Sequence, residues 1–391
     1  MSHAAIMIPG IDRLGGAERQ AITLATGLRQ RGWRVTMVAL CGKGGEAAAA
    51  LCKQGVGFVS LEMRKGLADP RGWIRLHRWL RREQPHVIHA HLPHAAWMAR
   101  WSRLAAYVPV VIDTLHSSHT GKIGRKIGYN LSSRLPDRVT AVSQAVAAAH
   151  VAESMVCEDR LTVLANGLDV ELWKPDETAR ADTRWLAGLK DEFLWLAVGR
   201  LEPVKDYPTL LHAMALAPLN ARLAILGEGP QRADLEQLTR KLDLASRVHF
   251  VGFETNVKRW MNAADGFVLS SCYEGLPMVL LEAGACGLPA VATDVPGTRE
   301  ALVHGDTGLL AKAGDPAALR AAMSTVMWLN GDDRRAMGER ARGWVSERFG
   351  IESVLDRWET LYADLLERDK VRRRIPFTAW ESLKRRSATS A

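Results

Sequence analysis

Two carboxylates stand eight positions apart in a short segment of the C-terminal half. Glu274 precedes a Gly-Leu-Pro turn at residues 275–277, and Glu282 lies in the apolar run that follows. Pro277 suits the first position of a helix, because its missing N–H would be unpaired there anyway. The N–H groups and the dipole of such a helix start favour a bound phosphate. One carboxylate can accept hydrogen bonds from a sugar and the other from a ribose, so the segment suits a nucleotide-sugar.

Two cations follow an apolar run at residues 193–198. Arg200 and Lys205 would lie just beyond the end of the strand that this run predicts. Negative charge on a leaving diphosphate grows in the transition state, so fixed cations at this place would lower the barrier. We expect the pair to do the work of a metal ion, and two solvated surface charges are the alternative.

Glycines mark two further points where a predicted strand ends. Gly15 and Gly16 lie between the first apolar run and the first helical pattern. Glycines there would allow a positive φ and a close approach of the backbone to phosphate. A second glycine turn, at residues 227–230, carries Glu228. The alternative for such turns is an ordinary connection between a strand and a helix.

Histidines gather around the strands predicted near residues 87–89 and 110–115. His116 follows the second of these strands, and a polar loop histidine is the alternative to a site residue. Four others stand close together in the sequence: His86, His89, His91 and His94. His89 and His91 share one face of a strand, because side chains alternate with period two. Zinc is disfavoured, because structural zinc usually takes four ligands with cysteine among them and none is near.

Short apolar runs alternate with helical patterns along the chain, which indicates an α/β fold with parallel, doubly wound sheets. In the first half, strands are predicted at residues 4–8, 35–40, 87–89, 110–112, 139–142 and 161–164. Helices are predicted between them at residues 16–31, 70–84, 94–105 and 123–135. Residues 165–191 are polar and weakly periodic, and we interpret them as a linker.

The same alternation then starts again. Strands are predicted at residues 193–198, 221–226, 248–251, 266–269 and 290–292. Helices are predicted at residues 207–216, 231–242, 277–286 and 316–328. Ligands of such folds bind beyond the carboxyl ends of the strands. Because every motif above follows a predicted strand, we expect two Rossmann-like halves with the motifs converging on one central cleft.

The motifs resemble, in order, those of the retaining glycosyltransferases called family 4, which have the GT-B fold. Residues 14–19 resemble the N-terminal glycine loop of the family, and residues 198–206 resemble its paired Arg and Lys motif. Residues 225–230 resemble the glycine turn of the family's second domain, and residues 274–282 resemble its E-x7-E signature. The likeness runs from about residue 6 to residue 362.

The resemblance implies a role for each of these residues. The implied donor-binding set is Gly15, Gly16, Arg200, Lys205, Glu228, Glu274, Gly275, Leu276, Pro277, Met278 and Glu282. Within it, Arg200 and Lys205 hold the diphosphate. Glu282 holds the ribose hydroxyls, and Glu274 holds the transferred sugar. His116 would lie beside the reacting carbon and complete a catalytic set with Glu274, Arg200 and Lys205.

The resemblance also implies the chemistry. The family retains the anomeric configuration, and its suggested course is a same-face attack in which the leaving diphosphate oxygen helps to deprotonate the acceptor. No residue here can be assigned as the carboxylate nucleophile of a retaining glycosidase. No metal or other cofactor is expected, because the chain has no Asp-x-Asp sequence. The expected enzyme is a hexosyltransferase that uses a UDP- or GDP-sugar.

Positive charge is concentrated in the first half of the chain. Residues 1–185 contain 25 Lys and Arg against 16 Asp and Glu, whereas residues 186–391 contain 27 of each. Residues 370–386 contain seven basic residues and one acidic residue. A basic half and a basic tail indicate an anionic partner, either lipid phosphate or nucleic acid.

A basic amphipathic helix is predicted within residues 70–82. Trp73, Leu76 and Leu80 can share one of its faces. The arginines of this helix and a second basic cluster form the expected membrane-contacting set: Arg75, Arg78, Arg81, Arg82, Lys122, Arg125 and Lys126. Such helices can lie on anionic membranes, and a core-packed helix with a solvated basic face is the alternative.

The length and the N-terminal sequence of the chain bear on its domains and its location in the cell. We expect an acceptor-binding domain at 1–175, a nucleotide-sugar domain at 190–350, a helix at 351–368 crossing back to the first domain, and a basic tail at 369–391. No run approaches the roughly 18 apolar residues that span a bilayer, and no basic leader precedes the first strand. We therefore expect a cytoplasmic chain held peripherally on the inner face of the cell membrane. The five scattered cysteines are expected to be reduced and buried.

The preferred function is transfer of a hexose to a polyprenyl-diphosphate-linked glycan of a surface polysaccharide, such as lipopolysaccharide or exopolysaccharide. The same chemistry on a soluble acceptor is an alternative that leaves the basic half unexplained. Nucleotide-sugar 2-epimerases share the GT-B architecture but lack this E-x7-E segment with its Gly-Leu-Pro turn. A nucleic-acid-binding protein would account for the charge, yet no stacking-aromatic or helix-turn-helix signature supports it.

Overall fold

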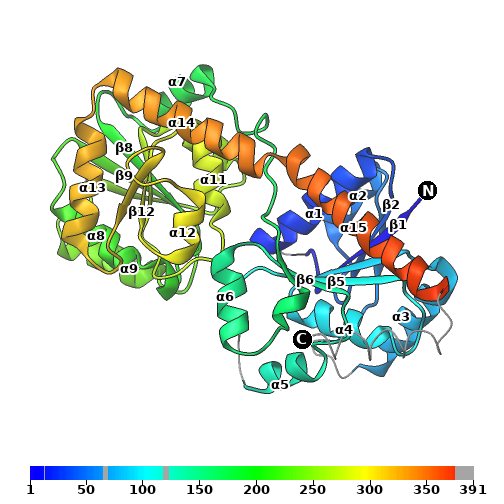
Figure 1. Cartoon of the computed structure of the whole chain (residues 1–391). Helices are drawn as coiled ribbons and strands as arrows, with labels where there is room; N and C mark the ends of the chain where they lie inside the picture. The colour runs from blue at the N-terminus through cyan, green and yellow to red at the C-terminus, as the bar shows by residue number, and fades with distance from the viewer. Residues whose placement is uncertain (13, 65–68, 118–122, 375–391) are drawn as a thin grey trace, which may run out of the picture. The chain divides into compact units, whose positions relative to one another are not determined.

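The computed structural model describes residues 1–12, 14–64, 69–117 and 123–374 of the chain. The chain divides into two compact units. Within the described residues, the first comprises residues 1–141, 149–164 and 355–374, and the second comprises residues 142–148 and 165–354. Each unit contains one parallel sheet with helices packed on it (Figure 1).

The sheet of the first unit has seven strands in the order β3-β2-β1-β4-β5-β6-β7. They are β1 (His3–Ile8), β2 (Arg34–Ala39), β3 (Gly57–Ser60), β4 (Val87–His91), β5 (Val110–Leu115), β6 (Arg138–Ala141) and β7 (Leu161–Val163). Every residue of β1, β4 and β5 is buried, as expected for a parallel sheet covered on both faces. The strand order reverses between β1 and β4, and ligands of doubly wound sheets bind at the carboxyl ends of such a pair.

Helices follow most of these strands. They are α1 (Gly16–Gln30), α2 (Gly45–Lys53), α3 (Pro70–Glu83), α4 (Pro93–Ser102), α5 (Ile123–Leu131) and α6 (Gln144–Ala152). The apolar and helical patterns of the sequence did not predict β3, α2 and α6. The residues of β3 are only partly buried, so they lack the apolar run that marks an interior strand.

Most of the C-terminal helix α15 (Ile351–Arg374), from Leu355 on, belongs to the first unit, and Figure 1 shows it in orange to red beside α1. A Cβ atom on Gly27 of α1 would lie 2.6 Å from the Leu355 side chain, so α1 and α15 touch closely here. Arg31 bonds to Asp356 at 2.6 Å and to Glu359 at 2.8 Å. The helix runs to Arg374, beyond the range 351–368 expected for it.

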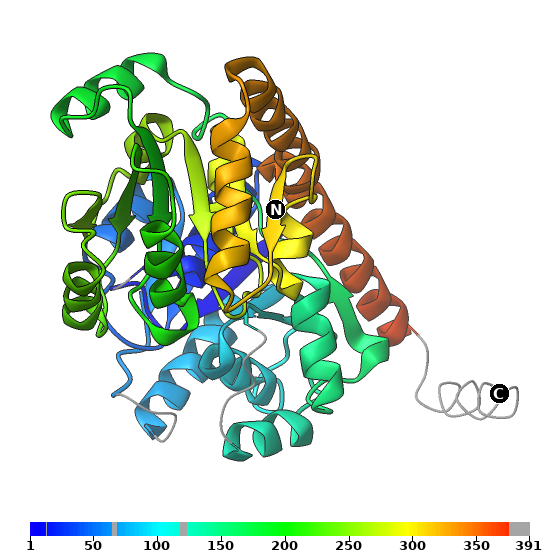
Figure 2. The same cartoon turned by 90° about the vertical axis from the view of Figure 1, so that its left-hand side faces the viewer.

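The sheet of the second unit has six strands in the order β10-β9-β8-β11-β12-β13. They are β8 (Phe193–Val198), β9 (Ala221–Leu226), β10 (Val248–Gly252), β11 (Gly266–Leu269), β12 (Ala290–Thr293) and β13 (Gly308–Ala311). Its helices are α7 (Glu177–Leu186), α8 (Tyr207–Ala215), α9 (Arg232–Lys241), α10 (Val257–Ala263), α11 (Met278–Ala285), α12 (Pro296–Ala301), α13 (Pro316–Trp328) and α14 (Gly331–Phe349). Figure 2 shows α13, in orange, lying across this sheet. The order reverses between β8 and β11.

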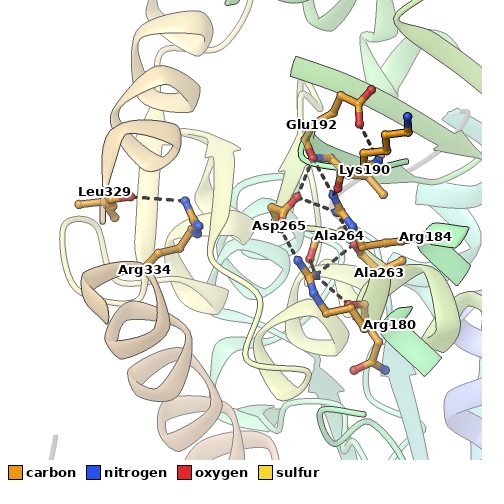
Figure 3. Close-up of polar contacts among 11 residues, drawn as sticks. Arg180, Arg184, Lys190, Glu192, Ala263, Ala264, Asp265, Leu329 and Arg334 are labelled. Carbon is orange, nitrogen blue, oxygen red and sulfur yellow. Dashed lines mark hydrogen bonds and ion pairs between the residues drawn. The ribbon is translucent and has the colours of Figure 1, made fainter. Parts of the chain in front are cut away.

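The segment expected to be a linker contains a helix, α7, that charged side chains hold against the second unit. Arg180 and Arg184 of α7 bond to the two carboxylate oxygens of Asp265, at 2.5 and 2.9 Å (Figure 3). The same carboxylate accepts the N–H of Leu194 at the start of β8. The sequence did not predict α7, because ion pairs attach much of this helix to the second unit and an apolar face, which would mark a packed helix, contributes less.

Two expectations about composition can be compared with the structure. No helix within the described residues is long and apolar enough to cross a membrane. All five cysteines are free. Cys286 is buried, but Cys52 and Cys272 are exposed, so the expectation of uniformly buried thiols was wrong.

Candidate functional site

The second unit brings Lys205 and Glu274 together. Lys205 ends a short 3-10 helix (Pro203–Lys205) that follows β8, and Glu274 lies in the loop after β11. Their Nζ and Oε1 atoms are 2.6 Å apart, and the side chains are 21% and 12% exposed. Because β8 and β11 are neighbours where the strand order reverses, the pair stands at the place where this fold binds ligands.

Hydroxyl groups bond to the Lys205–Glu274 pair and to the backbone next to it. Ser271 donates to Oε1 of Glu274 at 2.6 Å, and Ser270 donates to the carbonyl of Lys205 at 2.8 Å. Buried Tyr207 donates to the carbonyl of Gly199 at 3.1 Å. Burial raises the pKa of the Tyr207 hydroxyl, so this donor keeps its proton. Oε2 of Glu274 accepts no hydrogen bond from the described residues and is available to a ligand.

Arg200 differs from Lys205 in its surroundings. Its side chain is 75% exposed, and its guanidinium bonds to Glu202 at 2.7 Å. Each cation of the expected pair therefore faces its own carboxylate. The sequence predicted the two cations but not these carboxylate partners.

Glycine turns at the ends of β8, β9 and β10 lie against one another. A Cβ atom on Gly227 would be 2.0 Å from the carbonyl oxygen of Gly199, and Gly227 has a φ of +138°. A Cβ atom on Gly229 would be 2.4 Å from the carbonyl oxygen of Leu201. These positions need glycine for close packing of the turns. Glu228, between the two glycines, is half exposed and bonds to Arg232 at 3.3 Å.

The Gly-Leu-Pro turn meets a second helix start. Helix α11 begins at Met278, so Pro277 is the N-cap and lies one position before the place expected for it. Leu276 is buried. A Cβ atom on Gly297 of α12 would be 2.4 Å from the carbonyl oxygen of Glu274 and 2.7 Å from that of Gly275. Close packing on α12 therefore fixes the turn that carries Glu274.

Glu282 lies one turn into α11 and is half-buried. It is close enough to Cys286 to affect that thiol, whose pKa rises to about 12 through burial first and the charge of Glu282 second. Glu282 therefore lies on the side of α11 that carries Cys286 one turn later.

Gly15 and Gly16 lie at the start of α1 in the first unit, but not with the backbone geometry expected for them. Gly15 is the N-cap with a φ of −91°, and Gly16 also lacks a positive φ. The N–H of Gly15 donates to Glu18 at 3.1 Å. The described residues leave open space around a Cβ atom built on Gly16. The argument for glycine from a positive φ was therefore wrong at this loop.

His116 lies at the end of β5 in contact with His91 at the end of β4. Nδ1 of His91 is 2.9 Å from Nε2 of His116. His89, also on β4, is fully buried and bonds to Tyr362 of α15 at 2.7 Å and to Thr114 at 2.6 Å. Three imidazole rings thus form a row, with centroids 4.2 Å apart for His89 and His91 and 5.2 Å apart for His91 and His116.

Burial keeps these rings uncharged. It lowers the pKa of His89 to about 3 and that of His116 to about 4, and it lowers the pKa of His91 well below its usual value. Nearby imidazoles lower the values of His89 and His91 further. Among the described residues, no group of three or more His, Cys, Asp or Glu side chains could hold a metal ion.

Several supporting residues were missed by the sequence analysis. Ser271 donates to Glu274, Gly297 packs against the carbonyl oxygen of Glu274, and Tyr207 donates to the carbonyl of Gly199. Tyr362 bonds to His89 across 273 positions of sequence. The two serines after β11 carried a signal, because polar residues at a strand end near a reversal of strand order often face a ligand. No local pattern predicts the Tyr362 contact.

Helix α3 presents its basic face to solvent and its apolar face to the protein. Leu76, Trp79 and Leu80 are buried, and Trp73 packs edge-on against Trp97 at 5.9 Å. Trp73, Leu76 and Leu80 are thus used in packing, and Ile74 is exposed beside the arginines. Arg75 bonds to Glu62, and Lys126 to Glu153. Lys122 lies outside the described residues, and Arg125 lies on α5.

Comparisons with known proteins agree with this arrangement. The family described as Glycosyltransferase Family 4 matches residues 14–172, and the family described as Glycosyl transferases group 1 matches residues 180–344. The N-acetyl-alpha-D-glucosaminyl L-malate synthase of Bacillus anthracis is 30% identical over 74% of this chain and 77% of its own length. The lipopolysaccharide core biosynthesis glycosyltransferase LpsD of Rhizobium meliloti is 30% identical over 92% of this chain and 97% of its own length.

One further sequence relative and one solved structure are also similar to this chain. An Escherichia coli UDP-Gal:alpha-D-GlcNAc-diphosphoundecaprenol alpha-1,3-galactosyltransferase is 24% identical over 77% of this chain and 81% of its own length. The crystal structure of Anabaena HepE in complex with UDP-glucose superposes with a TM-score of 0.82 at 23% identity, covering 92% of this chain and 99% of that one.

Two parallel, doubly wound sheets of this kind have the GT-B fold. The chain belongs to the group 1 glycosyltransferases of family 4.

Proposed function

We propose that this glycosyltransferase moves a hexose from a UDP- or GDP-sugar to a lipid-linked glycan, with retention of configuration and without a metal ion. The observation that carries the proposal is the Lys205–Glu274 pair where β8 and β11 meet. Lys205 can neutralise the leaving diphosphate, and Oε2 of Glu274 can accept a hydrogen bond from the sugar.

The proposed step needs only the groups already described. The bond between the anomeric carbon and the diphosphate oxygen breaks, and the acceptor hydroxyl oxygen attacks from the same face. Its proton passes to the leaving diphosphate. Lys205 and Arg200 stabilise the growing negative charge, Glu282 holds the ribose, and the turn from Gly275 to Met278 offers N–H groups to the phosphates.

The acceptor class rests on charge and on relatives. The E. coli relative acts on a diphosphoundecaprenol-linked sugar, and the R. meliloti relative belongs to lipopolysaccharide core biosynthesis. The basic face of α3 offers an anionic lipid surface several exposed arginines. The B. anthracis relative, named for L-malate, supports the alternative of a soluble acceptor.

A transfer assay tests the proposal and its independence of metal. We expect one UDP- or GDP-hexose to be used, excess chelator to leave the rate unchanged, and the product to keep the anomeric configuration of the donor. Cations supplied by the protein do the work that a bound divalent ion does elsewhere. An inverted product, or a rate that chelator abolishes and a divalent ion restores, would contradict this chemistry. Transfer only to small soluble acceptors would favour the alternative.

Membrane attachment is expected to depend on salt and on lipid charge. Each basic residue near an anionic surface contributes about 1 kcal/mol, and salt screens this attraction. Replacing Arg78, Arg81 and Arg82 with glutamine should therefore weaken co-sedimentation with anionic vesicles. Donor binding should not change, because the replaced side chains lie on the exposed face of α3.

A matched variant controls for the loss of three positive charges. Arg240, Lys241 and Arg335 are exposed residues of the second unit, and their replacement with glutamine should leave sedimentation unchanged. Equal sedimentation of the α3 variant and the wild type across a salt series would show that α3 has only a solvated face.

A further inference from the structure

A second histidine lies directly behind His116, and the proposed chemistry does not use it. Nδ1 of His91 is 2.9 Å from Nε2 of His116, with the two ring planes inclined by 33°. His91 is 2% exposed, whereas His116 is half-buried. His91 is therefore shielded from solvent, and it contacts the ring that is expected to meet the donor sugar.

The two rings share one proton. A hydrogen bond between two imidazole nitrogens needs an N–H on one of them and a lone pair on the other. Both rings are neutral near pH 7, because burial lowers the pKa of each. A neutral imidazole has a single N–H. The nitrogen that holds the shared proton therefore decides the tautomer of both rings.

The far nitrogen of His91 distinguishes the two arrangements. Nε2 of His91 is buried and has no hydrogen-bond partner among the described residues. If His116 were the donor, His91 would carry its own proton at this atom, as a buried N–H without an acceptor. Such groups are rare in folded proteins. If His91 is the donor, its Nε2 has only a lone pair, next to the ring of His89.

We propose that His91 is a positioning residue that holds His116 in the tautomer with its N–H at Nδ1. In this arrangement Nδ1–H of His91 donates to Nε2 of His116. Nδ1 of His116 makes no hydrogen bond to the described residues, so its N–H can donate to a ligand. The inference rests on the proposed function only for the identity of that ligand, a hydroxyl of the donor sugar.

Nitrogen NMR tests the tautomer without any enzymatic assay. The full chain is labelled with ¹⁵N-histidine, and the ring signals of His116 are identified by their loss in His116→Gln. We expect a protonated Nδ1 and an unprotonated Nε2 on His116 in the wild type. A protonated Nε2 on His116 would overturn the proposal, whatever the activity.

Two substitutions of His91 separate the hydrogen bond from simple packing. The side-chain amide of asparagine can donate from nearly the place of Nδ1, so His91→Asn should keep the His116 tautomer and most of the activity. Leucine fills the space without a donor, so His91→Leu should lose the tautomer and lower kcat. We expect a loss of roughly 10- to 100-fold, the size of effect known for the outer partners that orient metal-ligating histidines. KM for the sugar nucleotide should change little, because an interaction made in the transition state affects kcat.

The outcomes distinguish this proposal from the proposed function. Wild-type kcat in His91→Leu, or an equal loss of activity in both variants with an unchanged tautomer, would leave His91 a packing residue only. Should His91→Leu fail to fold, the wild-type spectrum and His91→Asn decide. A His116 with the expected tautomer in a protein that transfers no sugar would refute the function alone. His212, which is exposed on α8, supplies the matched control His212→Leu, for which no change is expected.

Discussion

Replacing Lys205 with alanine should lower kcat/KM for sugar transfer by roughly 10²- to 10³-fold, the usual effect of removing one preorganised group that stabilises transition-state charge. Lys205 is the cation that the fold holds most firmly here, because it is mostly buried and bonds to Glu274 at 2.6 Å. Its loss removes the positive charge that would neutralise the leaving diphosphate, and it also frees the Glu274 side chain to move.

Glu282→Ala should lower kcat/KM through lost contact with the ribose.

Two measurements make this prediction decisive. Lys241 is an exposed lysine at the end of α9, and Lys241→Ala should transfer sugar at the wild-type rate. Thermal unfolding should show that Lys205→Ala remains folded at the assay temperature. Near-wild-type transfer by a folded Lys205→Ala protein would remove the central observation from the proposed function.

Replacing Asp113 with alanine should lower the free energy of unfolding of the first unit by about 3–5 kcal/mol, because it leaves a buried arginine without its counter-charge. Arg100 is fully buried and bonds to both carboxylate oxygens of Asp113, at 3.2 and 2.8 Å. It also donates to the carbonyl of Tyr129 and the hydroxyl of Ser132. Removing both charges together, in Arg100→Met with Asp113→Leu, should recover much of the loss.

Hydrogen exchange of peptides from β4 and β5 reports on this unit alone, which matters because a chain of two units need not unfold in one step. Arg335 and Asp332 form an exposed pair on α14, and Arg335→Ala should change exchange in the first unit very little. Unchanged protection of β4 and β5 in Asp113→Ala would show that the pair contributes little to stability.

The interior strands and the Lys205–Glu274 pair show what sequence patterns can predict. Residues 193–198 form β8 within the limits expected, because a strand buried on both faces is a continuous apolar run. The position of Lys205 just after that strand then followed from the topology. Its bond to Glu274, 69 positions away, did not follow, since it depends on how two loops pack.

The elements and contacts that were missed share a physical reason. Strand β13 (Gly308–Ala311) lies at a sheet edge and is partly exposed, so its residues carry no strong apolar signal. Helix α7 is held by Arg180 and Arg184, and charged residues on a helix usually indicate solvent. The contact of His91 with His116 joins the ends of two neighbouring strands, 25 positions apart in the sequence, so no local spacing predicts it.

The position of α15 has a consequence for the order in which the protein can fold during its synthesis. Tyr362 and Trp358 of α15 contact His89, and Glu359 accepts the indole N–H of Trp33 at 2.7 Å. The first unit thus lacks part of its interior until α15 has left the ribosome, whereas residues 165–354 have been made by then. Although the N-terminal domain of a nascent chain usually folds first, here the part made first is completed last. A chain interrupted before Leu355 would expose His89 and Trp33 to solvent, so quality control could recognise it by its N-terminal half.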